Sequence, residues 1–239
     1  MTGPIINAAG IILGGLWSLA AKRPIAGLYQ VAIKIVLGVY AVWFGLKLTW
    51  SSINGSIGQV AKEMGIVLVA MTAGKIVGRL MHLQKLSNSI GKHATTVLSA
   101  PGANNSFNES FVMATGLFCA GPLAVLASVQ EGLTGFSPVF LVKAATDGLA
   151  TYAFCMTFGW GVMVAAIPVL AFEMALVRGA QWLEPILHRG PWPLIDAVNA
   201  VDGLLIFCVA MIILELKKIQ VADYYPSLVL APLLARWLW

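Results

Sequence analysis

The sequence predicts an all-α, polytopic membrane helical bundle of about seven to eight spans, on two observations. First, 59% of the 239 residues are hydrophobic and only 10% are charged, whereas a soluble domain carries about 25% charged residues. The mean hydropathy is +0.86. Second, the apolar runs are continuous and longer than the alternating segments of ~10 residues that form a spanning β-barrel. We therefore expect a single integral membrane domain over residues 1–239, with the lipid bilayer as its surroundings.

Eight hydrophobic segments follow one another along the chain, and several are short or interrupted by Gly and Pro. They cover residues 4–20, 29–50, 59–80, 107–129, 138–158, 162–182, 194–216 and 226–239. Interrupted segments suit broken or re-entrant helices, which are tolerated where protein or water shields the backbone. A count of seven spans therefore stays open beside eight. The polar connection 82–106 indicates a short amphipathic or irregular link, not a second domain.

Basic residues in the connections predict the orientation. With eight spans, one side of the membrane collects Lys22, Arg23, Arg79, Lys85, Lys92, Lys217 and Lys218. Lys and Arg concentrate in cytoplasmic loops, so this side is expected to be cytoplasmic and both termini to lie outside. The N-terminus has no charged region before its first apolar run, so residues 4–20 are expected to remain as a helix and not to be cleaved as a signal peptide.

Two stretches suggest an internal repeat. Residues 27–48 and 201–218 each form an apolar helix that ends near a Leu-Lys pair. Segments one to three would then correspond to segments six to eight as inverted halves, 1–80 and 160–239, around central helices in 107–158. Inverted repeats are common in secondary transporters, with binding sites near the midplane. Shared apolar composition explains the match equally well.

The segment 138–158 carries a polar stripe. Lys143, Asp147, Thr151 and Cys155 recur every four residues and therefore share one helix face. Asp147 lies ~14 Å into this segment at ~1.5 Å per residue, near the middle of a ~30 Å hydrocarbon layer. An acid at that depth is a candidate for proton or cation binding, with Thr151 supplying oxygen. The alternative is a Lys143–Asp147 ion pair that fixes helix packing.

Glu131 is the second main candidate. It lies in Gln-Glu-Gly-Leu-Thr-Gly, where the glycines and threonine allow the backbone to expose its carbonyls and amides. In a broken helix it would be a ligand or gate, and in a surface loop it would be unremarkable. Asn7, early in the first segment, is expected to cap a helix or to offer its amide to a midplane site.

Further candidates lie in later segments. Glu173 falls in the middle of segment six, and a structural role for it would require a partner. Asn199 and Asp202 are three residues apart, and their oxygen atoms suit hard cations, although an interhelical hydrogen bond is equally plausible. Lys34, Lys75 and Lys143 lie within segments and offer an alternative path, for an anion.

Several classes lack support in the sequence. The three histidines, His82, His93 and His188, fall in connections without HxxxH or HExxH spacing, which disfavours a metalloenzyme. There is no P-loop, GxGxxG or GxSxG motif, which disfavours ATP-driven transport and serine hydrolysis. No basic tract suits nucleic acid. We expect neither enzymatic activity nor a cofactor.

Short motifs along nearly the whole chain carry a family resemblance. They are residues 3–7 with Gly14-Gly15, Phe118-Cys119, 131–135, Lys143 with Asp147, 159–168, 201–205 and 226–234. In this order they resemble the YqgA/YdfK-like family of bacterial membrane proteins, a domain of unknown function. The chain differs from that pattern at Asp202 and at Gly121-Pro122. The resemblance implies a multi-pass inner-membrane protein and supplies no substrate.

Together these features favour a gradient-driven transporter or channel for a small ion or polar solute. The alternative is a non-transporting structural or regulatory membrane subunit. Gly10 and Gly14 have the small-xxx-small spacing that permits helix association, within one chain or in a homo-oligomer.

Overall fold

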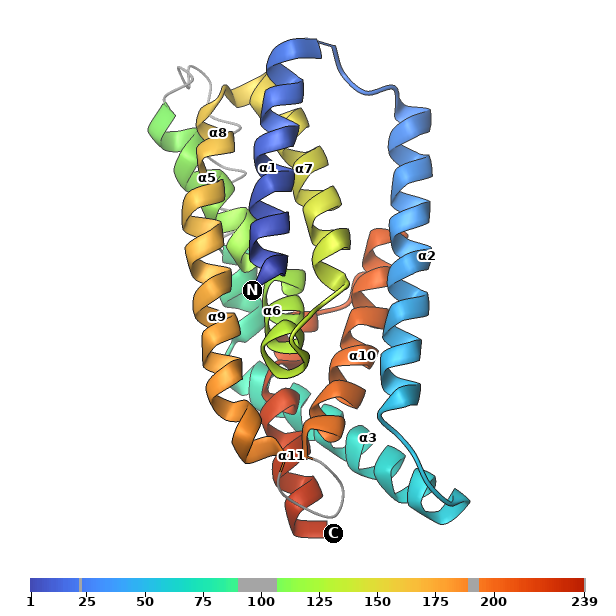
Figure 1. Ribbon diagram of the computed structural model, residues 1–239. Helices are drawn as coiled ribbons and strands as arrows, with labels where there is room; N and C mark the ends of the chain where they lie inside the picture. Colours follow the sequence, from blue (N-terminus) through green and yellow to red (C-terminus); the bar gives the residue numbers. More distant parts are fainter. Residues whose placement is uncertain (22, 90–106, 189–193, 239) are drawn as a thin grey trace. The chain divides into compact units, whose positions relative to one another are not determined.

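The computed structural model describes all residues except 22, 90–106, 189–193 and 239 (Figure 1). Within that part the regular elements are all helices, which confirms the predicted all-α class. The helices form two compact units that interleave along the sequence, Met1–Ile33 with Leu86–Arg178 and Lys34–Lys85 with Gly179–Trp239. They are called unit 1 and unit 2 below. The predicted internal repeat stays a prediction. Lys22, Lys92 and His93 lie outside the described residues.

Unit 1 contains the helices that build the candidate site. They are α1 (Thr2–Ala21), α5 (Phe107–Ala120), α6 (Pro122–Thr134), α7 (Val139–Phe158), α8 (Gly161–Val164) and the part of α9 (Ala166–Leu187) up to Arg178. The predicted segment 107–129 is broken into α5 and α6, and the chain bends by 57° between them. Pro122 starts α6 after Gly121, a place where its missing N–H costs no helical bond. Gly135 ends α6 with φ 85°, a left-handed conformation that glycine adopts without strain.

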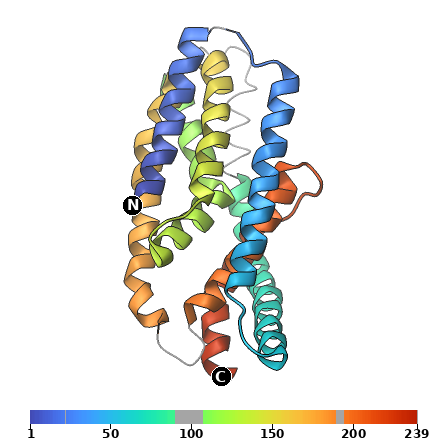
Figure 2. The same cartoon turned by 45° about the vertical axis from the view of Figure 1, so that its right-hand side comes forward.

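Helices α1 and α7 lie side by side (Figures 1 and 2) and approach closely. A Cβ atom on Gly14 would lie 2.0 Å from the carbonyl oxygen of Gly148, and one on Gly10 would lie 2.6 Å from that of Ala144. Small residues permit such backbone contact between membrane helices. The predicted association of Gly10 and Gly14 is therefore made within the chain. It places the middle of α1 against the first half of α7.

Unit 2 repeats this kind of packing with other helices. They are α2 (Gly27–Ser51, from residue 34), α3 (Ile57–Leu80), α10 (Leu194–Ile213), the 3₁₀ helix η1 (Val221–Tyr224) and α11 (Pro226–Leu238). Helix α3 meets η1 and α11 at Gly74 and Gly78, where an added Cβ would lie 2.6 Å from Ser227 and 2.0 Å from the carbonyl oxygen of Asp223. Glycines thus set the helix contacts in both units.

Five described helices are long and apolar enough to cross a membrane. They are Thr2–Ala21, Gly27–Ser51, Val139–Phe158, Gly161–Leu187 and Leu194–Ile213. Two bent pairs, Ile57–Leu80 with Leu83–Ser89 and Phe107–Ala120 with Pro122–Thr134, raise the count to seven if each is one span. The eighth predicted segment is α11, whose 13 residues fall short of the ~20 that a span needs. The orientation assumed eight spans and stays a prediction.

Candidate functional site

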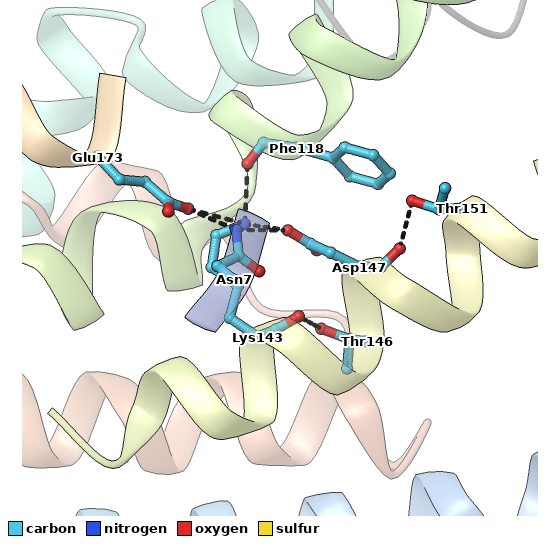
Figure 3. Close-up of polar contacts among 7 residues, drawn as sticks. All are labelled: Asn7, Phe118, Lys143, Thr146, Asp147, Thr151 and Glu173. Atoms are coloured by element: carbon cyan, nitrogen blue, oxygen red, sulfur yellow. Dashed lines mark hydrogen bonds and ion pairs between the residues drawn. The ribbon is translucent and has the colours of Figure 1, made fainter. Parts of the chain in front are cut away.

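The polar stripe of α7 is the core of a buried charged cluster in unit 1 (Figure 3). The ammonium of Lys143 forms an ion pair with the Asp147 carboxylate one turn later, as the four-residue spacing allows. The same ammonium lies 3.4 Å from Oε1 of Glu173 on α9. The Lys143 and Glu173 side chains are 2% and 0% exposed, and that of Asp147 is 13% exposed. The Lys143 ammonium is therefore shared by the carboxylates of Asp147 and Glu173.

Asn7 brings α1 into the same cluster. Its amide nitrogen donates to Oε1 of Glu173 at 2.8 Å and to Oδ2 of Asp147 at 3.3 Å. Asn7 is fully buried and lies five residues into α1, on the stretch that the glycine contacts hold against α7. The cluster thus joins α1, α7 and α9. Asn7 contacts the acids, as the sequence hypothesis of an amide at an internal site proposes, and does not cap a helix.

The broken helix α5–α6 contributes a backbone group to the cluster. Lys143 donates from Nζ to the carbonyl oxygen of Phe118 at 3.1 Å. In a continuous helix that carbonyl would accept the N–H of residue 122, but residue 122 is proline and has no N–H. The lysine therefore satisfies the carbonyl that Pro122 leaves free. This contact was not predicted, although the Gly121-Pro122 break was its signal in the sequence.

Two oxygen atoms of the cluster stay without a donor. Oε2 of Glu173 and Oδ1 of Asn7 are buried and have no hydrogen-bond partner among the described residues. Two carboxylates against one ammonium leave the cluster one negative charge in excess when all three groups are ionised. Buried charge without compensation is strongly unfavourable. The arrangement can therefore hold one further proton or small cation.

Glu131 lies at the N-terminus of α1. Both of its carboxylate oxygens accept the backbone N–H of Gly3 at 3.0 Å, and Oε1 lies 2.9 Å from the amino group of Met1. The first N–H groups of a helix lack partners inside it, and negative charge is stabilising there. Glu131 thus fixes the start of α1. Gly3 and Asn7 are one turn apart, about 6 Å along the axis, so α1 connects this cap to the cluster.

The remaining predicted residues have different surroundings. The Thr151 hydroxyl donates to the backbone carbonyl of Asp147 at 2.7 Å, so its proton serves the main chain of α7. Asn199 and Asp202 are buried in α10 of unit 2. The structure therefore brings together Asn7, Asp147 and Glu173 of the predicted set with Lys143, and the Lys143–Asp147 ion pair given as the alternative is present.

Within the described ranges, no three or more His, Cys, Asp or Glu side chains are placed to hold a metal ion. The three lysines of the anion hypothesis each have a partner. Lys143 pairs with the acids, Lys34 lies 2.6 Å from Glu215, and the Lys75 ammonium lies 5.0 Å from the centre of the Tyr224 ring.

Comparison with known sequences agrees with the motif pattern. The family described as "Protein of unknown function (DUF554)" matches residues 2–236. The chain belongs to this family. This DUF554 protein is 26% identical over 239 residues to the "Uncharacterized protein YqgA" of Escherichia coli (strain K12), covering 98% of this chain and 97% of the relative. It is also 26% identical over 236 residues to the "Uncharacterized membrane protein YdfK" of Bacillus subtilis (strain 168), covering 97% and 94%. No solved structure matches.

These findings confirm the predicted family and class. YdfK is named a membrane protein, and this DUF554 protein has five to seven helices that can cross a membrane. It is a polytopic membrane protein. Among the described residues of unit 1, the cluster of Lys143, Asp147 and Glu173 has two acids for one buried lysine.

Proposed function

We propose that this DUF554 protein is a gradient-driven transporter or channel for a small ion or polar solute in the bacterial inner membrane. The observation that supports it is the pair of buried acids, Asp147 and Glu173, which share the single ammonium of Lys143. Intramembrane acids commonly mark ion pathways and proton relays. The relatives come from bacteria, which is the basis for the proposed location.

Two acids that share one ammonium suggest a carrier cycle. Lys143 neutralises one carboxylate, and the other takes a proton or a small cation. Asn7 donates to both acids, so its amide stabilises whichever acid is ionised. Taking up or releasing one positive charge then changes which acid holds Lys143. Such a change alters contacts between α1, α7 and α9, and thereby couples binding to helix movement. Rocking of two helix groups about a midplane site is the mechanism known for such carriers.

Two other predicted residues, Glu131 and Thr151, act as supports in this proposal. Glu131 fixes the start of α1 and so the place of Asn7. Thr151 bonds to the backbone at Asp147. No step requires a nucleophile, a nucleotide or a cofactor, so the proposal is for transport and not for an enzyme.

Flux in proteoliposomes tests the proposal. Wild type is compared with Glu173→Gln and Asp147→Asn over H⁺, Na⁺, K⁺, divalent cations and small anions. Glu215→Gln is the matched control, because Glu215 is an acid with an exposed side chain in an ion pair. We expect flux of one ion in wild type and control and a severe loss of that flux in the cluster variants, since intramembrane acids commonly lie on ion pathways. Flux that the cluster variants leave unchanged would sink the site assignment.

The alternative is a non-transporting structural or regulatory subunit. Its support is that Lys143 also satisfies the Phe118 carbonyl and that Glu131 caps α1, both of which are packing roles. In that case wild type would carry none of the ions, and Asp147→Asn would change thermal stability or assembly with partners instead of flux.

A further inference from the structure

Unit 2 holds a buried acid in quite different surroundings. Asp202 lies near the middle of α10 and is 1% exposed. Neither of its carboxylate oxygens has a hydrogen-bond partner in the part of the chain that the structure describes. An isolated carboxylate in an apolar interior is among the costliest groups to keep ionised.

A second polar group without a donor lies on the same helix. Asn199 precedes Asp202 by three residues, so both lie on one face of α10. Asn199 is 7% exposed, and its Oδ1 also has no partner within the described residues. Three buried oxygen atoms therefore lack a donor within one turn of α10. A single O–H group on Asp202 is the kind of donor that the Asn199 oxygen lacks.

The neighbouring helix α2 does not supply that donor. The Thr49 hydroxyl packs against α10 at Gly203, but it donates to the backbone carbonyls of Gly45 and Ala200, at 3.0 and 3.2 Å.

Charged groups on the helices packed against α10 are engaged elsewhere or exposed. On α2, Lys34 pairs with Glu215 and Lys47 lies over the Trp43 ring. On α3 and η1, Glu63 and Asp223 accept backbone N–H groups of Asn54 and Gln84, and Lys75 lies over the Tyr224 ring. The others on α3 and α11 are exposed, namely Lys62, Arg79 and Arg236.

We infer that Asp202 is a proton-binding site, separate from the charged cluster of unit 1, and that it carries its proton as a neutral carboxylic acid at neutral pH. A hydronium ion gives the proton to one carboxylate oxygen and leaves as water. A proton needs only one oxygen, whereas hard metal cations take six or more oxygen ligands, and α10 offers three here. The inference does not depend on the proposed function.

Infrared spectroscopy of the full-length protein tests this directly. The difference spectrum of wild type minus Asp202→Asn is recorded at neutral pH in H₂O and in D₂O. We expect the carbonyl-stretch band of a protonated carboxylic acid in wild type only, with a shift in D₂O. A difference spectrum that shows loss of an ionised carboxylate band instead would overturn the inference.

A second measurement needs no variant and so survives a folding failure of Asp202→Asn. A hydrophobic carbodiimide reacts with protonated carboxyl groups inside membranes, and peptide mass spectrometry locates the adduct. We expect modification of Asp202 at neutral pH, at the same rate with and without NaCl. Sodium ions that slow the reaction at fixed pH would identify the site as a metal-cation site and overturn the proton assignment. Neither test measures flux, so both can be interpreted even if the transport assay shows no flux.

Discussion

Asp147 and Asp202 occupy equivalent kinds of position and differ in everything around them. Each lies near the middle of an apolar helix and is largely buried. Asp147 has Lys143 one turn before it and the Asn7 amide beside it. Asp202 has Asn199 one turn before it and no donor among the described residues. Depth in the membrane therefore identifies a candidate acid, but the groups around it decide whether it has a cation or a donor to pair with.

The helix packing does not explain this difference. Both units bring helices together at glycines, and an added Cβ would lie 2.0 Å from a backbone oxygen at Gly14 in unit 1 and equally at Gly78 in unit 2. Both units pack their helices at glycines. Unit 1 buries a cluster of paired charges, whereas unit 2 buries an acid that we infer to be neutral.

The largest expected effect comes from removing the shared lysine. Lys143→Met leaves Asp147 and Glu173 buried without their cation and leaves the Phe118 carbonyl without its donor. Removing one partner of a buried ion pair costs about 3–5 kcal/mol. We expect thermal unfolding in detergent to show a loss of that size. The double variant Lys143→Met with Asp147→Asn should recover part of it, and a double variant less stable than the single one would contradict the shared-charge interpretation.

Glycine substitutions should show that the units are alike in packing. Gly14→Ala and Gly78→Ala each place a Cβ 2.0 Å from a backbone oxygen, and overpacking of this kind costs about 1–3 kcal/mol. Gly65→Ala on α3 is the matched control, because an added Cβ there meets no atom within 4 Å. It should be neutral or stabilise by about 0.5–1 kcal/mol. If the free energy of unfolding fell equally in all three variants, the close helix contacts would not be the reason for glycine at these positions.

Two matched Asp-to-Asn substitutions compare the contributions of Asp147 and Asp202 to stability. Asp147→Asn removes one of the two acids that pair with Lys143, leaving Glu173 as the other, and loss of this charged hydrogen bond should cost about 1–3 kcal/mol. Asp202→Asn replaces a neutral acid by an amide of nearly the same shape, so we expect a smaller loss than for Asp147→Asn. Both are measured by thermal unfolding under identical detergent conditions. A larger loss for Asp202→Asn than for Asp147→Asn would indicate that Asp202 is ionised and paired.

Local spacing predicted the parts of this picture that depend on one helix. The four-residue interval gave the Lys143–Asp147 pair, and Gly121-Pro122 marked an interruption of an apolar run. Continuous apolar composition gave the membrane class. These features follow from helix geometry and from the preference of apolar side chains for lipid. Both can be recognised from residues that are close together in the sequence.

Contacts between distant residues could not be predicted in the same way. Glu131 caps Gly3 across 128 positions, and Asn7 reaches Glu173 across 166. Such pairs depend on which helices pack together and at what height, and one sequence does not encode this locally. That Asp202 lacks a donor is likewise a property of its surroundings. The hydrogen-bond partners of a buried acid therefore had to come from the structure.

An exposed ion pair provides the smallest effect and shows whether burial gives the cluster its strength. Lys34 and Glu215 lie 2.6 Å apart, with side chains 52% and 72% exposed. The hydrogen bond from Lys34, and then its charge, lower the pKa of Glu215 from its ordinary value of 4.5. A lowered acid pKa stabilises the folded state above the ordinary value and loses that contribution as the pH falls through the folded pKa. Because water screens exposed pairs, Lys34→Ala should shift the midpoint of thermal unfolding far less than Asp147→Asn at neutral pH, and not at all in strong acid. An equal shift for the two variants would mean that pairing alone, and not burial, accounts for the stability that Lys143 gives unit 1.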